Sequence, residues 1–215
     1  MTIRGVIFDM DGVLVDSEEF ICEAAVRMFA ERGLAVRPAD FRPFVGAGED
    51  RYLGGVAEKH GFPLDLERDK ARTYELYGQI VRGRLQPLPG VHRFIGKCRA
   101  RGLRLALATS ADRVKMLINL REIGLPPETF DAAVNGLDVA HKKPAPDIFL
   151  LAAGRLGHAP AECLVVEDAV NGVAAARAAG ARCLALTTSF TREQLAGADF
   201  FAANLAEAPE AALDW

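Results

Sequence analysis

The sequence contains no apolar run close to the roughly 18 residues that a membrane-spanning helix needs. It also lacks a basic N-terminal region followed by an apolar segment, so we expect no secretory leader. Neither sign of charge dominates, because 26 Lys and Arg residues face 29 Asp and Glu residues, for a net charge of −3. This balance does not favour nucleic acid or an acidic membrane as a partner. We therefore expect a cytoplasmic protein that binds neither.

Cysteine is scarce and scattered along the chain. Cys22, Cys98, Cys163 and Cys183 form no Cys-x-x-Cys pair, and the four histidines show no metal-ligand spacing. These spacings argue against a zinc site and against a disulfide framework. We expect reduced thiols, most of them buried in the core.

What the sequence does contain is a regular alternation of strand-like and helical segments. Its 215 residues are 50% hydrophobic, which is enough for a full core and for an insertion within it. The alternation predicts a parallel sheet covered by helices on both faces. Strands are predicted at Val6–Phe8, Leu105–Ala108, Asp131–Val134, Leu164–Val166 and Arg182–Leu186, and helices near Arg113–Ile123, Asp147–Leu156 and Val170–Ala179. The alanine-rich segment 196–212 is expected to form helix and loop.

Residues 17–84 have a different sequence pattern, with helical periodicity and no convincing strand. Helices are predicted at Glu18–Arg32, Asp50–His60 and Leu66–Arg82, the first of them capped by Asp16 with Glu19. A helical block placed directly after the first strand indicates a lid. We therefore predict an α/β core domain of residues 1–16 and 85–215, with a helical cap domain of residues 17–84 inserted into it.

The most informative segment is Gly5–Ser17, which reads GVIFDMDGVLVDS. A short apolar strand leads into Asp9 and Asp11, at the carboxyl edge of the sheet where open α/β folds bind ligands. If the segment is extended, both carboxylates leave the same face. Two such charges repel each other unless a cation compensates them. Mg²⁺ suits this position, because it takes oxygen ligands from one or two carboxylates and a phosphate.

This segment resembles the opening motif of the haloacid dehalogenase superfamily of phosphotransferases. The resemblance implies a Rossmann-like parallel sheet with an inserted helical cap, and a Mg²⁺-dependent phosphoryl transfer. It further implies that Asp9 is the nucleophile, and that Asp11 protonates the leaving oxygen and later deprotonates water. That role requires Asp11 to carry a proton at the first step.

Three later elements match the same superfamily pattern in order. Thr109 and Ser110 follow the strand Leu105–Ala108, and they would bind the phosphoryl group through a hydroxyl and a backbone amide. Lys143 stands in Lys-Pro-Ala-Pro-Asp and would neutralise the phosphoryl oxygens. Glu167 and Asp168 follow the strand Leu164–Val166, and the resemblance assigns them to metal binding. The implied metal site comprises Asp9, Asp11 through its backbone carbonyl, Asp168, and Glu167 directly or behind it.

The resemblance is strongest to the β-phosphoglucomutase-like subgroup, which contains both phosphatases and a sugar phosphate mutase. The mutases carry a cap histidine and a cap arginine where this sequence has Ile21 and, nearby, Glu49. These departures favour a phosphatase acting on a small-molecule phosphate ester, with the mutase as the alternative. A catalytically silent domain that binds phosphate or a protein is the remaining alternative. The sequence is compatible with a monomer or a weak dimer.

Substrate choice is expected to lie in the cap. The loop Gly46–Arg51 opens a helix, and Gly48, Glu49 and Arg51 are the candidates for contact with the substrate. Arg113 and Lys115 could reach a second anionic group of the substrate, but we interpret them as solvated charges on a helix.

Overall fold

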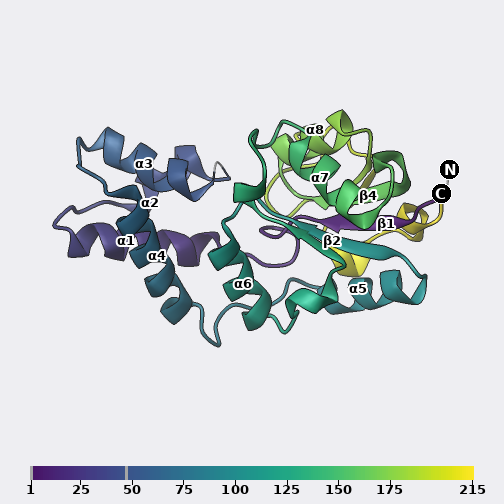
Figure 1. Ribbon diagram of the computed structural model, residues 1–215, viewed down its shortest axis with the longest axis horizontal. Helices are drawn as coiled ribbons and strands as arrows, with labels where there is room; N and C mark the ends of the chain where they lie inside the picture. The colour runs from purple at the N-terminus through teal and green to yellow at the C-terminus, as the bar shows by residue number, and fades with distance from the viewer. Residues whose placement is uncertain (1, 47) are drawn as a thin grey trace.

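The protein is built around a single six-stranded parallel sheet (Figure 1). A computed structural model describes residues 2–46 and 48–215. The strand order is β3-β2-β1-β4-β5-β6, and every neighbouring pair is parallel. The strands are β1 (Gly5–Phe8), β2 (Arg104–Ala108), β3 (Ala132–Val134), β4 (Cys163–Glu167), β5 (Arg182–Leu186) and β6 (Phe200–Ala202). The predicted α/β class with a Rossmann-like parallel sheet is therefore confirmed.

Helices cover both faces of this sheet, as Figure 1 shows. Side chains alternate along β1, so that Val6 and Phe8 join one hydrophobic cluster while Ile7 joins another. The first cluster lies against α5 (Val91–Ala100) and α6 (Arg113–Glu122), and the second against α7 (Asp147–Leu156) and α8 (Val170–Ala178).

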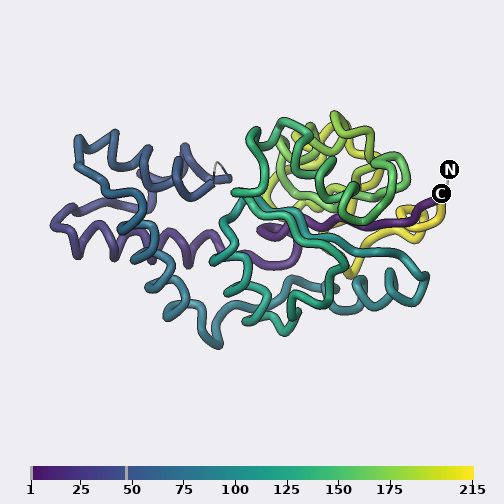
Figure 2. The backbone as a smooth tube through the Cα atoms, in the orientation of Figure 1, coloured from purple at the N-terminus to yellow at the C-terminus, as the bar shows by residue number. Residues whose placement is uncertain are grey.

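Four further helices lie beyond one end of the sheet, where Figures 1 and 2 place residues 18–80. They are α1 (Glu18–Glu31), α2 (Pro38–Phe41), α3 (Glu49–Lys59) and α4 (Leu66–Ile80), followed by the return of the chain to α5. The outgoing and returning segments are joined, because Val15 bridges Pro87 and the N–H of Leu88 donates to Leu14 O at 2.9 Å.

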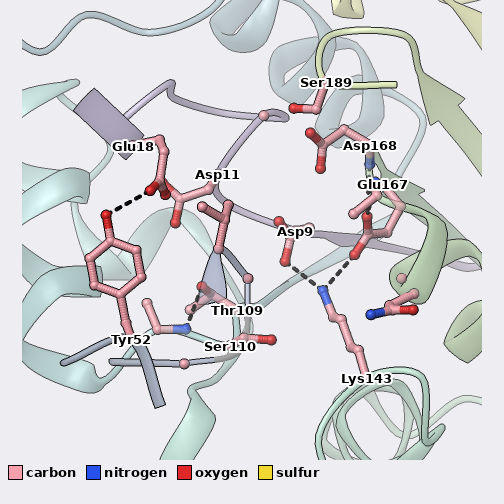
Figure 3. A pocket seen from close by; sticks show the side chains of 18 of the residues that line it. Asp9, Asp11, Glu18, Tyr52, Thr109, Ser110, Lys143, Glu167, Asp168 and Ser189 are labelled. Carbon is pink, nitrogen blue, oxygen red and sulfur yellow. Dashed lines mark hydrogen bonds and ion pairs between the residues drawn. The ribbon is translucent and has the colours of Figure 1, made fainter. Parts of the chain in front are cut away.

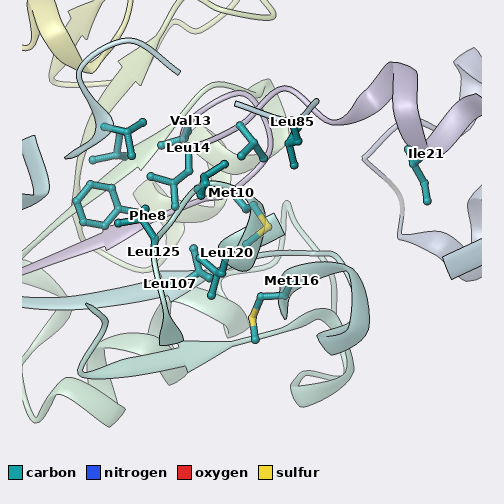
Figure 4. Close-up of a cluster of buried hydrophobic side chains, with 14 of the residues drawn as sticks. Phe8, Met10, Val13, Leu14, Ile21, Leu85, Leu107, Met116, Leu120 and Leu125 are labelled. Atoms are coloured by element: carbon teal, nitrogen blue, oxygen red, sulfur yellow. The ribbon is translucent and has the colours of Figure 1, made fainter. Parts of the chain in front are cut away.

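The loop after β1 is held in place by Met10, the residue between its two aspartates. Met10 is completely buried among apolar side chains, including Phe8, Leu107 and Leu120 (Figure 4). Because β1 ends at Phe8 and the chain bends at Met10, Asp9 and Asp11 are not part of an extended strand. The extended segment that would place both carboxylates on one face of a strand is therefore not formed.

Several other local predictions also needed correction. Strand β6 lies inside the alanine-rich segment expected to hold only helix and loop, and α5 was not predicted. The residue that precedes α1 is Ser17 rather than Asp16, and its side chain makes no capping hydrogen bond. The cysteines are free, and all but the partly buried Cys22 are buried, as expected. Within residues 2–46 and 48–215, no helix is both long and apolar enough to cross a bilayer.

Leu107→Ala should destabilise the protein by about 2–5 kcal/mol, because its fully buried side chain fills the cluster beneath the site and a cavity would remain. Leu137→Ala is the matched control, since Leu137 is 63% exposed and its loss should change stability by less than about 0.5 kcal/mol. Urea unfolding of both variants measures the difference. Equal stabilities would contradict the assigned packing.

Candidate functional site

A pocket of about 430 Å³ opens at the carboxyl edge of the sheet, between the strand ends and the helices α1 and α3. The first strand supplies Asp9 and Asp11 just beyond its end, and the neighbouring strands supply Thr109 and Glu167. Parallel strands bring their carboxyl ends to one edge, which is why segments far apart in sequence meet here.

The centre of the site is the ammonium group of Lys143, held between two carboxylates (Figure 3). Its Nζ donates to Asp9 Oδ1 at 2.6 Å and to Glu167 Oε1 at 2.6 Å. Burial opposes the charge on Lys143, but Asp9 and Glu167 outweigh it and raise the pKa of the ammonium group. The preference for Lys143 over Lys142 is supported by this geometry, because Lys142 donates instead to the carbonyl of Gly136.

The acidic side of this group carries more negative charge than Lys143 can balance. Burial raises the pKa of Asp9 well above its ordinary range, against the pull of Lys143 and with the help of Glu167 and Asp168. Burial, followed by repulsion from Glu167, raises the pKa of Asp168 to about 7. Carboxylates held this close favour a further cation beside them.

Two glycines make room for the carboxylates after β4. A Cβ on Gly172 would overlap the carboxylate of Glu167, and a Cβ on Gly12 would overlap that of Asp168. Gly12 also has a φ of +76°, which side-chain-bearing residues rarely adopt. The glycines of both motifs are therefore explained by the close approach of an acidic side chain.

Glu167 is fully engaged within the protein. Oε1 accepts from Lys143, and Oε2 accepts from the N–H groups of Asp168 and Ala169, both at 2.8 Å. Its geometry is that of a group that fixes the lysine, rather than one whose oxygens are free for a metal.

Asp11 lies on the other side of the pocket from the Lys143 group (Figure 3). One of its oxygens accepts from the hydroxyl of Ser17, and the other accepts from Lys115 Nζ at 3.0 Å. The interpretation of Lys115 as a solvated helix charge was wrong, because its side chain is only 6% exposed. Arg113 is exposed, as expected.

The hydroxyl element also lies in the pocket. Thr109 directly follows β2, and its buried Oγ1 accepts from the N–H of Ala111 at 3.1 Å, while Ser110 lines the pocket beside it. The loop that these residues begin leads directly into α6.

The predicted cap residues divide between the pocket and the surface. Gly48 and Glu49 line the pocket, and Glu49 is only 7% exposed. Arg51 does not line it, because its guanidinium contacts Glu58 at 2.7 Å and lies over the ring of Phe44. We therefore withdraw Arg51 as a substrate contact. Ala47, in the same loop, lies outside the described residues.

Some pocket residues were missed by the sequence reasoning. Ser189 and Phe190 line the pocket, and Thr188 donates to the carbonyl of Gly12 at 2.6 Å. A signal for them existed, because a run of hydroxyl residues follows the buried strand β5 just as Thr109 follows β2. Glu18 and Tyr52, which are joined by a hydrogen bond of 2.8 Å, come from α1 and α3 and carried no such signal.

The donor set fits Mg²⁺ rather than a softer metal. Among the described residues, no three His, Cys, Asp or Glu side chains converge closely enough to hold a metal by themselves. Mg²⁺ needs less than this, since it binds one or two carboxylates and completes its octahedron with water and substrate phosphate. The carboxylates of Asp9 and Asp168, which line the pocket together with Asp11, are oxygen donors of this kind.

Comparisons with known proteins agree with this geometry. Residues 3–180 match the model of a family described as haloacid dehalogenase-like hydrolase. Protein SUPPRESSOR OF QUENCHING 1, chloroplastic, of Arabidopsis thaliana is 44% identical over 194 residues, covering 88% of this chain. The chain spans only 18% of the length of that plant protein.

Two further similarities extend over most of both chains. The Phosphorylated carbohydrates phosphatase of Thermotoga maritima is 35% identical over 189 residues, covering 83% of this chain and 82% of that protein. The crystal structure of a CbbY mutant from Rhodobacter sphaeroides, in complex with xylulose-(1,5)bisphosphate, superposes with a TM-score of 0.89. It is 29% identical and covers 100% of each chain.

Gly172→Ala should lower turnover by about tenfold or more, because the added Cβ displaces the carboxylate that holds Lys143, and small misplacements of catalytic groups are costly. Gly154→Ala is the matched control, since Gly154 also lies within a helix but its Cβ would meet nothing within 4 Å. Phosphate-release assays on both variants, with circular dichroism to verify folding, measure the effect. Wild-type turnover in Gly172→Ala would show that catalysis does not depend on the placement of the Glu167 carboxylate.

Proposed function

This chain belongs to the haloacid dehalogenase-like hydrolase family, and on that premise we propose that it is a Mg²⁺-dependent phosphatase of small-molecule phosphate monoesters. The observation that carries the proposal is the ammonium group of Lys143, placed 2.6 Å from the carboxylate of Asp9 at the floor of the pocket. A buried cation directly beside a potential nucleophile suits the transfer of a phosphoryl dianion.

In the first step, a carboxylate oxygen of Asp9 attacks the phosphorus in line, and the bond from phosphorus to the alcohol oxygen breaks. Asp11 gives its proton to that oxygen. In the second step, Asp11 takes a proton from water as the water oxygen attacks phosphorus, the bond to Asp9 breaks, and inorganic phosphate leaves. Lys143 and the Thr109 and Ser110 segment hold the phosphoryl oxygens through both steps.

The proposed metal ligands are the carboxylates of Asp9 and Asp168 and the backbone carbonyl of Asp11. When bound, Mg²⁺ would neutralise the charge of the phosphoryl group and of the carboxylates around it. Of the two roles expected for Glu167, direct ligand or residue behind the ligands, we propose the second, because both of its oxygens already accept hydrogen bonds from the protein.

Asp11 must change partners to act as an acid. Its oxygens accept hydrogen bonds from Ser17 and Lys115, on the side of the pocket away from Lys143. Release from Lys115 and rotation toward the leaving oxygen are therefore part of the proposed cycle. We propose that residues 17–84 act as a cap domain over the core of residues 1–16 and 85–215 and exclude water during the first step.

Two cap residues favour hydrolysis over the mutase alternative. Ile21 lines the pocket with an apolar side chain, and Glu49 lines it with a carboxylate. Neither can supply the positive charge that the mutase pattern places in the cap. The phosphorylated small molecule is the partner that we propose, and a cytoplasmic location and a monomeric or weakly dimeric state stay predictions.

The proposal is tested with p-nitrophenyl phosphate. Purified protein should hydrolyse it with Mg²⁺, lose this activity in excess chelator and regain it when Mg²⁺ is restored. Asp9→Asn should abolish turnover, because an amide is not a competent phosphoryl acceptor, whereas Asp214→Asn at an exposed ion pair should not. Undiminished hydrolysis in chelator, or by Asp9→Asn, would contradict the mechanism.

Asp11→Asn should lose far more activity on an alkyl phosphate than on p-nitrophenyl phosphate, since p-nitrophenolate leaves without a proton. The loss on the alkyl ester should be roughly 10²–10⁴-fold, the usual contribution of general acid–base catalysis. Steady-state kinetics on both esters give the two ratios. Equal losses would rule out Asp11 as the acid that protonates the leaving group.

A further inference from the structure

The pocket has a second half, which faces the cap and lies away from Lys143. We call it the cap half. It would surround the alcohol part of a substrate whose phosphoryl group lies at Asp9. Its lining residues are Asp11, Asp16, Glu18, Ile21, Arg42, Phe44, Val45, Glu49, Tyr52 and Lys115.

Lys115 is the buried cation of the cap half, and its charge is already matched. Its Nζ lies 3.0 Å from Asp11 Oδ2 and 3.7 Å from Glu49 Oε1. Burial opposes its charge, but Asp11 and Glu49 together raise the pKa of the ammonium group. A cation shared between two carboxylates has no surplus charge to offer to a substrate anion.

Glu49 presents an acceptor that the protein leaves without a donor. It is the first residue of α3, its side chain is 8% exposed, and it lines the pocket. Among the described residues, its Oε2 has no hydrogen-bond partner, although the atom is buried. Buried polar atoms are nearly always satisfied, so an orphaned carboxylate oxygen in a pocket points to a donor supplied by the ligand.

The cap half as a whole carries excess negative charge. Its lining contains four carboxylates, those of Asp11, Asp16, Glu18 and Glu49, against the cations of Lys115 and Arg42. Arg42 is exposed, so its charge is the more strongly screened of the two. A second phosphate or a carboxylate on the substrate would enter a region of its own sign.

We propose that Glu49 determines substrate specificity: it accepts a hydrogen bond from a hydroxyl of an uncharged, hydroxyl-bearing alcohol, and with the other acids it excludes substrates that carry a second anionic group. This inference rests on the proposed phosphatase activity. A substrate ammonium group suits the site less well, because at Glu49 it would lie against the ammonium of Lys115.

This specificity would distinguish the chain from CbbY, a protein whose structure it resembles. Xylulose-1,5-bisphosphate, the ligand of that crystal structure, carries two phosphates. One of them would lie in the cap half if the other were at Asp9. We therefore expect the bisphosphate to be a poor substrate here.

The test compares matched esters that differ in one anionic group, with purified protein and Mg²⁺. The pairs are glycerol 3-phosphate with 3-phosphoglycerate, and xylulose 5-phosphate with xylulose-1,5-bisphosphate. In each pair kcat/KM should be at least about tenfold higher for the ester with the uncharged alcohol, the effect of one charged contact. Phosphoethanolamine should be hydrolysed more slowly than glycerol 3-phosphate.

Glu49→Gln removes the charge and keeps the shape of the side chain. It should reduce the preference within each pair by about fivefold or more, mainly through a lower KM for the anionic member. Glu58→Gln is the control, because Glu58 lies on the same helix but is 69% exposed and outside the pocket, so its preferences should match the wild type.

Hydrolysis of p-nitrophenyl phosphate distinguishes a failure of the phosphatase proposal from a failure of the specificity proposal. Failure of the wild type on this ester refutes the phosphatase itself. Turnover of this ester with equal or better kcat/KM for the anionic members overturns only the specificity inference. It is equally overturned if phosphoethanolamine is the best substrate, if no alcohol phosphate in the panel reacts, or if Glu49→Gln leaves the ratios unchanged.

Discussion

Repulsion among carboxylates at one edge of the sheet is the constraint on which this site depends. Asp9, Glu167 and Asp168 are buried together because β1 and β4 are neighbours in a parallel sheet. Lys143 offsets part of that charge through two contacts of 2.6 Å. The glycines that admit the carboxylates and the backbone amides that hold Glu167 all serve the same arrangement. The negative charge that Lys143 does not offset is what the proposed Mg²⁺ would neutralise.

In the cap half, too, a buried lysine lies between two carboxylates. There Lys115 of α6 is enclosed by Asp11, in the loop after β1, and by Glu49 of α3, so segments far apart in the sequence share one buried cation. The same ion pair connects substrate choice to chemistry, since Asp11 is the proposed acid and Glu49 the proposed specificity residue. If both proposals hold, a substrate that donates a hydrogen bond to Glu49 would change the surroundings of Lys115, and through it those of Asp11.

The motif-bearing part of the site was predictable, because strand ends and their polar residues are local features of the sequence. Asp9, Thr109, Lys143 and Glu167 follow recognisable patterns, and parallel topology brings them together. Lys115 could not be placed in this way. Its burial depends on the packing of α6 against the helices of residues 18–80. The weak amphipathicity of α6 did not indicate that Lys115 faces the interior. Strand β6 was missed because Phe200–Ala202 is short, only half-buried and at the edge of the sheet.

The order of the strands also bears on how the protein folds. The first strand to be synthesised, β1, lies at the centre of the sheet, and its partners begin at Arg104 and Cys163. Closing loops of that length before any of these contacts can form slows folding, although each doubling of loop length costs only about 0.6 kcal/mol. No early fragment of the chain can hold Asp9 against Lys143 and Glu167. Recovery of catalytic activity during refolding would therefore mark completion of the central sheet, later than any signal from helix formation.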